Sequence, residues 1–200
     1  MSRILVVGED ALSCALGERL VEVGLPGWQL AGPSINTKGV TKLVPALPRY
    51  VEQAEHVQPV LCVADTDGKC TLDLLAEWLP RRKTDRFLLR LAVTEAESWL
   101  LADREGLAVA LNVPVTKLPL HPDAEPDPKR LVLNLAKRSK NHRVREEVVS
   151  SSDPSKPGSG YNLHLVAFVR SGWEASRAAA SSVSLARALN QLQDLGNRHG

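Results

Sequence analysis

The stretch Ile4-Leu5-Val6-Val7-Gly8-Glu9-Asp10, near the start of this 200-residue chain, carries the first signal of the fold. Four aliphatic residues, three of them β-branched, run up to a glycine, which is typical of a strand that is buried on both faces. Two acidic residues follow directly. We therefore expect a buried strand over residues 3–8 with carboxylates at its carboxyl end.

Strand and helix patterns alternate after this stretch. Apolar spacing predicts helices over residues 11–23, 40–53, 72–79 and 95–107, and strands over residues 28–31, 59–64 and 86–93. Pro45 and Pro48 are expected to break or kink the second of these helices. The alternation predicts an α/β fold, with a mostly parallel sheet flanked by helices.

The second half of the chain has a different character. Five prolines between residues 113 and 128 predict a loop, residues 129–140 form a basic amphipathic pattern, and residues 175–195 predict a long helix rich in small residues. We expect an α/β domain over residues 1–107 and a C-terminal extension over residues 108–200, basic and helical, packed on it. The small residues of the last helix would pack against the domain or against a second copy in a homo-oligomer.

Composition excludes several classes of protein. Hydrophobic residues make up 44% and charged residues 24% of the chain, with a net charge of +2, as in ordinary globular domains. No apolar run approaches the length of about 18 residues that a membrane helix needs. The three cysteines, Cys14, Cys62 and Cys70, favour reduced thiols in a cytoplasmic protein. There is no Walker loop for ATP.

Acidic residues follow three of the predicted strands. Glu9 and Asp10 follow the first, Asp65 and Asp67 the third, and Glu95 and Glu97 the fourth. The carboxyl ends of parallel strands share one edge of the sheet, so these carboxylates would repel one another and raise each other's pKa values. A divalent cation, Mg²⁺ or Mn²⁺, resolves that conflict. A helix cap or turn remains the alternative for an acid that follows a strand, above all for Asp10 and Glu95.

Two short motifs carry a family resemblance. Val7-Gly8-Glu9-Asp10 followed by Asp65-Thr66-Asp67 resembles the TOPRIM domain of topoisomerases, primases and OLD-type nucleases. The segment Glu95-Ala96-Glu97-Ser98-Trp99-Leu100-Leu101-Ala102-Asp103 resembles the glutamate–tryptophan–leucine element of small RloB-like TOPRIM relatives. The resemblance spans residues 3 to about 105.

This resemblance implies a TOPRIM-like fold and a role for each acid. Glu9 would be the general acid/base or a metal ligand, Asp65 and Asp67 would be ligands, and Glu95 or Glu97 would hold a second metal. The expected function is then a Mg²⁺- or Mn²⁺-dependent nuclease, acting on DNA or RNA beside an ATPase partner in anti-phage defence. Glu9, Asp65, Asp67 and Glu95 would be its catalytic residues.

Seven basic residues between positions 129 and 145 have no acid among them. They are Lys129, Arg130, Lys137, Arg138, Lys140, Arg143 and Arg145. Such a segment suits the phosphates of a nucleic acid. A solvated helix face or an acidic protein partner is the alternative interpretation.

Two rival functions stay open. One is a catalytically inactive TOPRIM-like scaffold or regulatory subunit that binds an ATPase. The other is a phosphoacceptor receiver domain, which also has an acidic pair after its first strand and an aspartate after its third. A receiver needs a lysine after its last strand, and Thr94-Glu95 stands there instead, so this rival is the weaker one.

Overall fold

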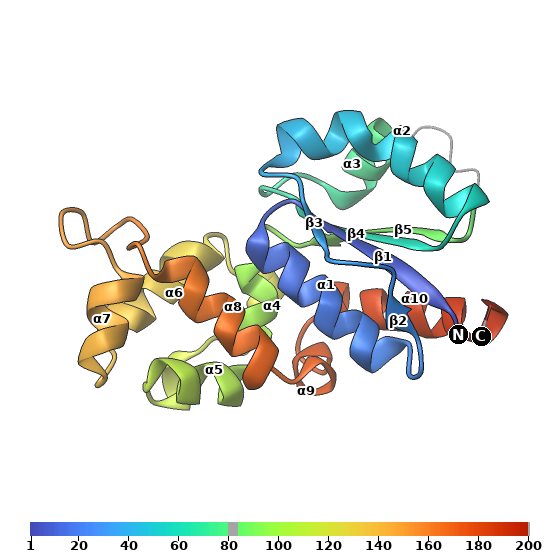
Figure 1. Ribbon diagram of the computed structural model, residues 1–200. Coiled ribbons are helices and arrows are strands. Elements are labelled where there is room, and N and C mark those ends of the chain that lie inside the picture. The colour runs from blue at the N-terminus through green and yellow to red at the C-terminus, as the bar shows by residue number, and fades with distance from the viewer. Residues whose placement is uncertain (80–83, 200) are drawn as a thin grey trace.

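A parallel β-sheet lies at the centre of the computed structural model, which describes residues 1–79 and 84–199 (Figure 1). Its strands β2 (Gln29–Leu30), β1 (Arg3–Gly8), β4 (Val60–Asp65) and β5 (Phe87–Ala92) lie side by side in that order. The short β3 (Ile35–Asn36) pairs with the carboxyl end of β1. All of these pairings are parallel. The expected α/β fold is therefore confirmed.

Helices cover both faces of the sheet. One face, with Leu5 and Val7, packs against α2 (Val40–His56) and α3 (Thr71–Trp78). The other, with Ile4 and Val6, packs against α1 (Ala11–Gly24) and joins the core of the C-terminal helices, including α10 (Val183–His199). Figure 1 shows these as layers above and below the sheet. Because β1, β4 and β5 are buried on both faces, their sequences are largely continuous apolar runs rather than alternating ones.

Helix α2 continues through Pro45 and Pro48 as one helix. Of the break or kink expected there, the break is therefore wrong. Each proline removes one backbone hydrogen bond, which frees a carbonyl one turn earlier. Both prolines are exposed, so water can reach the freed groups. The opposite side of the helix, with Leu43, Leu47 and Tyr50, is buried and holds it on the sheet.

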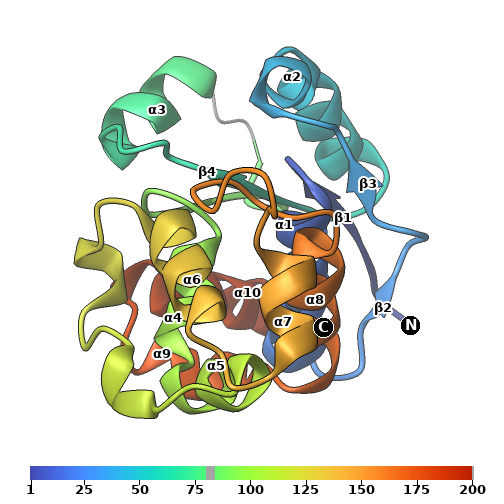
Figure 2. The ribbon, with the colours of Figure 1, turned by 90° about the vertical axis from the view of Figure 1, so that its left-hand side faces the viewer.

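The C-terminal half consists of helices grouped beside the α1 face (Figure 2), most of them short. They are α4 (Glu97–Ala102), α5 (Arg104–Leu111), the 3-10 turns Val115–Lys117 and Pro122–Ala124, α6 (Pro128–Lys137), α7 (His142–Val148), α8 (Tyr161–Ser171), α9 (Ala175–Ala179) and α10. One continuous apolar core joins them to β1, β4 and β5. The expected domain boundary after residue 107 lies inside α5.

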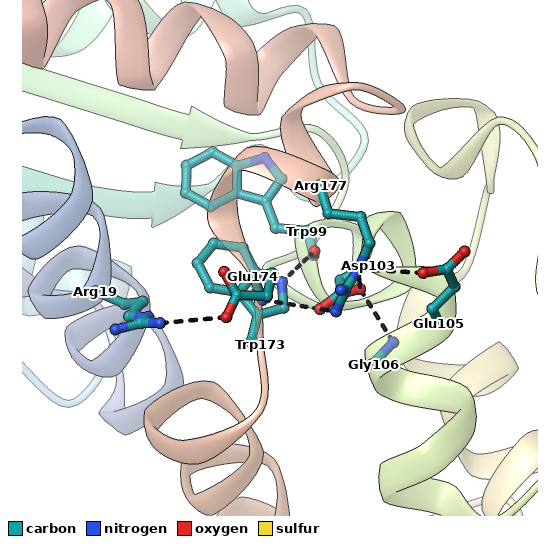
Figure 3. Close-up of polar contacts among 8 residues, drawn as sticks. All are labelled: Arg19, Trp99, Asp103, Glu105, Gly106, Trp173, Glu174 and Arg177. Carbon is teal, nitrogen blue, oxygen red and sulfur yellow. Dashed lines mark hydrogen bonds and ion pairs between the residues drawn. The ribbon is translucent and has the colours of Figure 1, made fainter.

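The helix expected over residues 95–107 is two helices, α4 and α5, which meet at Asp103. This side chain is fully buried, and it accepts hydrogen bonds from the Gly106 amide at the start of α5 and from the Glu174 amide before α9. The Arg177 guanidinium binds both carboxylate oxygens, at 2.5 and 2.9 Å. Figure 3 shows this cluster, with Trp173 donating its indole N–H to the Trp99 carbonyl beside it. Asp103 therefore ends one helix, caps the next and fastens both to α9.

The helix expected over residues 175–195 is also two, α9 and α10. Asp123 causes the break, because its carboxylate accepts hydrogen bonds from the Ser182 hydroxyl at 2.7 Å and the Ser184 amide at 3.0 Å. The Ser182 hydroxyl also accepts from the Leu185 amide, which satisfies the first turn of α10. Within the described residues, no helix has the length and apolar character needed to cross a bilayer.

Candidate functional site at the carboxyl edge of the sheet

Three acidic elements lie at one edge of the sheet because their strands are parallel neighbours. Gly8 of β1 pairs with Val63 of β4, and Asp65 of β4 pairs with Ala92 of β5. Glu9 follows β1 directly, Asp65 is the last residue of β4, and Glu97 is the first residue of α4, shortly after β5. The fold thus collects carboxylates that are up to 88 positions apart in the chain.

Glu9 and Asp65 are in contact. The Asp65 amide donates a hydrogen bond to Glu9 Oε2 at 3.3 Å, and the Glu9 amide donates to the Val63 carbonyl at 3.1 Å. Burial raises the pKa of Glu9, although the amides of Asp65 and Val40 act against it; the charge of Asp67 adds to the increase. The half-buried Glu9 carboxylate therefore accepts a proton more readily than an exposed one does.

Asp65 is the most strongly perturbed carboxyl of this group. Burial, then the charges of Glu97 and Glu9, raise its pKa to about 9, and Lys129 acts in the opposite direction. Its Oδ1 is buried and has no hydrogen-bond partner among the described residues. Asp65 is consequently protonated at neutral pH unless a further cation reaches it.

Glu95 and Glu97 share the ammonium group of Lys129. The Lys129 amide donates to Glu95 Oε2 at 2.9 Å, and its Nζ lies 3.5 Å from Glu95 Oε1 and 3.7 Å from Glu97 Oε1. The buried Tyr161 hydroxyl donates to Glu97 Oε1 at 2.8 Å. Burial lowers the pKa of Lys129, but the charges of Glu97, Glu95 and Asp65 outweigh burial and raise it. Burial raises the pKa of Glu97 despite the opposing effects of Lys129 and Tyr161.

The loops after β4 and β5 are hydrogen-bonded to each other, which fixes the edge. The buried Thr66 hydroxyl accepts from the Thr94 amide at 2.7 Å, and the Asp67 amide donates to the Thr94 carbonyl at 2.8 Å. Thr94 and Asp67 have positive φ angles of 62° and 49°. Such a conformation costs about 1–3 kcal/mol per residue and persists only where the surroundings impose it.

Gly8 and Asp10 build the turn that presents Glu9. A Cβ on Gly8 would lie 2.5 Å from the Cys14 amide nitrogen, so only glycine allows α1 to start this close to β1. Asp10 accepts a hydrogen bond from the Ser13 amide at 2.7 Å. Asp10 is therefore the N-cap of α1, the alternative interpretation of an acid that follows a strand.

The other predicted site residues are divided between this edge and the surface. Asp67 is exposed, and its charge reaches Glu9. Of the basic segment, Lys129 belongs to the acidic cluster itself. Arg130, Lys137, Arg138, Lys140 and Arg143 are exposed along α6 and α7. Arg143 pairs with Glu147, and the guanidinium of Arg145 donates to the Ser139 carbonyl.

Sequence reasoning missed two members of the cluster. Tyr161 follows a Ser/Pro/Gly-rich loop, and nothing near it in the sequence indicates that its hydroxyl meets Glu97, 64 positions earlier. The sequence predicts that Lys129 contacts a nucleic acid, whereas in the structure it binds Glu95 and Glu97. Its position after Asp127-Pro128 was the available signal, because that pattern starts a helix and fixes where the first side chains lie.

The oxygen donors at this edge match the chemistry of a hard divalent ion, Mg²⁺ or Mn²⁺. Such an ion would gain most at Asp65 Oδ1, a buried oxygen that has no hydrogen-bond partner among the described residues. Glu9 is the neighbouring carboxylate, because it accepts a hydrogen bond from the Asp65 amide. Within residues 1–79 and 84–199, no three His, Cys, Asp or Glu side chains already form a ligand group around one point. Binding would therefore require the carboxylates to turn toward a shared ion.

Comparisons with known proteins assign no family. No protein-family model matches the chain, and no solved structure matches it. Fructose-bisphosphate aldolase 1, chloroplastic, of Pisum sativum is 34% identical over 98 residues, which cover 48% of this chain and 26% of the aldolase. The chain thus matches about a quarter of that protein's length, and so partial a similarity places it in no family.

Proposed function

We propose that this protein is a nuclease that hydrolyses phosphodiester bonds of DNA or RNA with the aid of Mg²⁺ or Mn²⁺. One observation carries the proposal: the Asp65 carboxyl, on which the charges of Glu97 and Glu9 both act, has a buried oxygen without a partner among the described residues. Leaving a buried polar atom unsatisfied costs about 1–3 kcal/mol. A cation bound to that oxygen would remove this cost, and it would also offset the repulsion of Asp65 by Glu97 and Glu9.

Asp65 and Glu9 would hold the ion, with Asp67 at the exposed side. When bound, the ion would polarise a phosphate and lower the pKa of a water molecule. The chain's own groups have separate tasks. The Asp65 amide donates to Glu9 Oε2 and so keeps that carboxylate close to Asp65. Burial raises the pKa of Glu9, which makes its carboxylate a better proton acceptor for a nearby water molecule than an exposed glutamate is.

The exposed basic residues of α6 and α7 would bind the nucleic-acid strand. Helix α6 lies beside α4, and α7 lies farther out, so these residues extend away from the acidic edge (Figure 1). Contacts of this kind act on phosphates and carry no sequence preference, and they weaken steeply with salt. An ATPase partner and a role in anti-phage defence belong to the proposal through the TOPRIM resemblance alone.

A catalytically inactive scaffold is the second candidate. Lys129 already neutralises part of the acidic edge, and the described residues contain no ready-made ligand group. Under this alternative, the edge would be a structural feature, and the protein would act by binding an ATPase.

A cleavage assay separates the two candidates. Single- and double-stranded DNA and RNA are incubated with Mn²⁺ and the wild type, the double variant Asp65→Ala/Asp67→Ala, or the control Glu22→Ala, whose exposed carboxylate pairs with Arg19 on α1. We expect the double variant to lose activity by about 100-fold or more, because it lacks the groups that hold the ion, and the control to retain it. Equal cleavage by wild type and double variant would refute the site. A wild type that cleaves none of the substrates would support the scaffold.

A further inference from the structure

Lys129 connects the C-terminal half of the chain to the acidic edge. It lies in the first turn of α6, where Asp127 caps the helix by accepting from the Arg130 amide at 2.9 Å. This start aims the Lys129 amide and ammonium at the same carboxylate, Glu95, and brings the ammonium to Glu97 as well. The ammonium is held between two acids, with 40% of its side chain exposed.

The hydrogen bonds divide the acidic edge into two unequal halves. In the half formed by Glu95 and Glu97, both oxygens of Glu95 face Lys129, and Glu97 Oε1 accepts from Tyr161 and lies near the same ammonium. In the half formed by Glu9 and Asp65, Asp65 Oδ1 has no partner within the described residues. The first half already holds a cation in direct ion pairs. The charge of Lys129 also acts on Asp65, but Asp65 Oδ1 is left without a partner among the described residues.

We infer that Lys129 is a built-in cation that occupies the Glu95/Glu97 half, so that the edge takes one divalent ion, at Glu9 and Asp65, instead of two. The inference deepens the proposed function and depends on its metal site. Once a divalent ion binds and Asp65 loses its proton, four carboxylates at the edge are ionised, those of Glu9, Asp65, Glu95 and Glu97. One ammonium and one divalent ion then cancel three of their four negative charges. A second divalent ion would have to displace Lys129 from both glutamates.

The stoichiometry of Mn²⁺ binding tests this inference without any activity measurement. The full-length protein is titrated with Mn²⁺ at low ionic strength, and free Mn²⁺ is followed by electron paramagnetic resonance. We expect one bound Mn²⁺ per chain for the wild type and two for Lys129→Met, which keeps the apolar stem but removes the charge. Arg130→Met, the same change at the exposed neighbour, should stay at one.

Each outcome separates the inference from the function on which it rests. A wild type that binds no Mn²⁺ would overturn both. If the wild type and a folded Lys129→Met both bind one Mn²⁺ per chain, the inference is overturned and the metal site remains. The same holds if the wild type binds two Mn²⁺ per chain. If Lys129→Met does not fold, the variant Glu95→Gln provides the test. We expect it to bind one Mn²⁺ per chain with an affinity within about threefold of wild type. If Glu95 were itself a metal ligand, the affinity for Mn²⁺ would fall by about tenfold or more.

Discussion

Replacing Asp65 by asparagine is expected to stabilise the metal-free protein at pH 8 while abolishing Mn²⁺ binding. Burial and the charges of Glu97 and Glu9 raise the pKa of Asp65 from its ordinary 3.8 to about 9. Between these values the folded protein retains a proton that the unfolded chain has lost, so the free energy of unfolding falls as pH rises through this window. Asparagine has the shape of the protonated carboxyl and never ionises, so it removes that decline.

The size of the effect follows from the shift. One pKa unit corresponds to about 1.4 kcal/mol, and we expect a stabilisation of about 2 kcal/mol at pH 8, because solvent near the edge screens part of the repulsion. For a chain of this length this corresponds to an increase in Tm of about 4–8 °C. The measurement is thermal unfolding with EDTA at pH 5 and pH 8, comparing the wild type with Asp65→Asn.

The difference between the two proteins isolates Asp65 from other groups that titrate in the same range. We expect the wild type to lose more stability than Asp65→Asn between pH 5 and pH 8. Asp67→Asn serves as the control, because Asp67 is exposed and its removal relieves Glu9 only in part. A pH dependence that Asp65→Asn leaves unchanged, or a lower Tm for this variant at pH 8, would show that Asp65 is not under electrostatic strain.

Removing the Asp103 carboxylate should cause the largest loss of stability. Asp103→Ala leaves the Gly106 and Glu174 amides without their acceptor and Arg177 without its bidentate partner. Breaking a buried ion pair costs about 3–5 kcal/mol, and loss of a helix cap about 1 kcal/mol. Because 40% of the Arg177 side chain is exposed to solvent, we expect a total near the lower end, about 3–4 kcal/mol. Urea unfolding with an unchanged m-value measures it.

Two variants separate the contributions to this loss. Asp103→Asn keeps an oxygen that can cap α5, but the variant no longer offers two charged oxygens to the Arg177 guanidinium. Its free energy of unfolding should therefore lie between those of the wild type and Asp103→Ala. Glu105→Gln removes a neighbouring carboxylate that is 74% exposed and lies 3.8 Å from Arg177, and its effect should stay within about 0.5 kcal/mol. Equal losses for Asp103→Ala and Glu105→Gln would contradict the role assigned to Asp103.

The sheet and its acidic edge could be predicted because their signals are local. A run such as Ile4-Leu5-Val6-Val7 favours a strand that is buried on both faces, and parallel pairing then places every strand's carboxyl end on one side. The positions of Glu9, Asp65 and Glu97 at this edge follow from that single rule. The two-residue strand β3 has too few residues to give such a signal.

The contacts that complete the site depend on residues far apart in the chain. Lys129 binds Glu95, 34 positions earlier in the chain, and Tyr161 binds Glu97, 64 positions earlier. These contacts depend on how the helices pack against one another, which the apolar periodicity of each helix does not specify. The two helix breaks have the same origin. Asp103 and Asp123 each accept hydrogen bonds from groups 59 to 74 residues away, and these bonds outweigh the local helical pattern.

The most direct test of the metal site is anomalous diffraction from crystals grown or soaked with Mn²⁺ near pH 8. We expect a manganese peak at the carboxyl edge of β1 and β4, with oxygens of Glu9 and Asp65 at about 2.0–2.3 Å from the metal, as is usual for a hard divalent ion. An edge without manganese at a saturating concentration, or a peak bound elsewhere while Asp65 keeps its unpartnered oxygen, would contradict it.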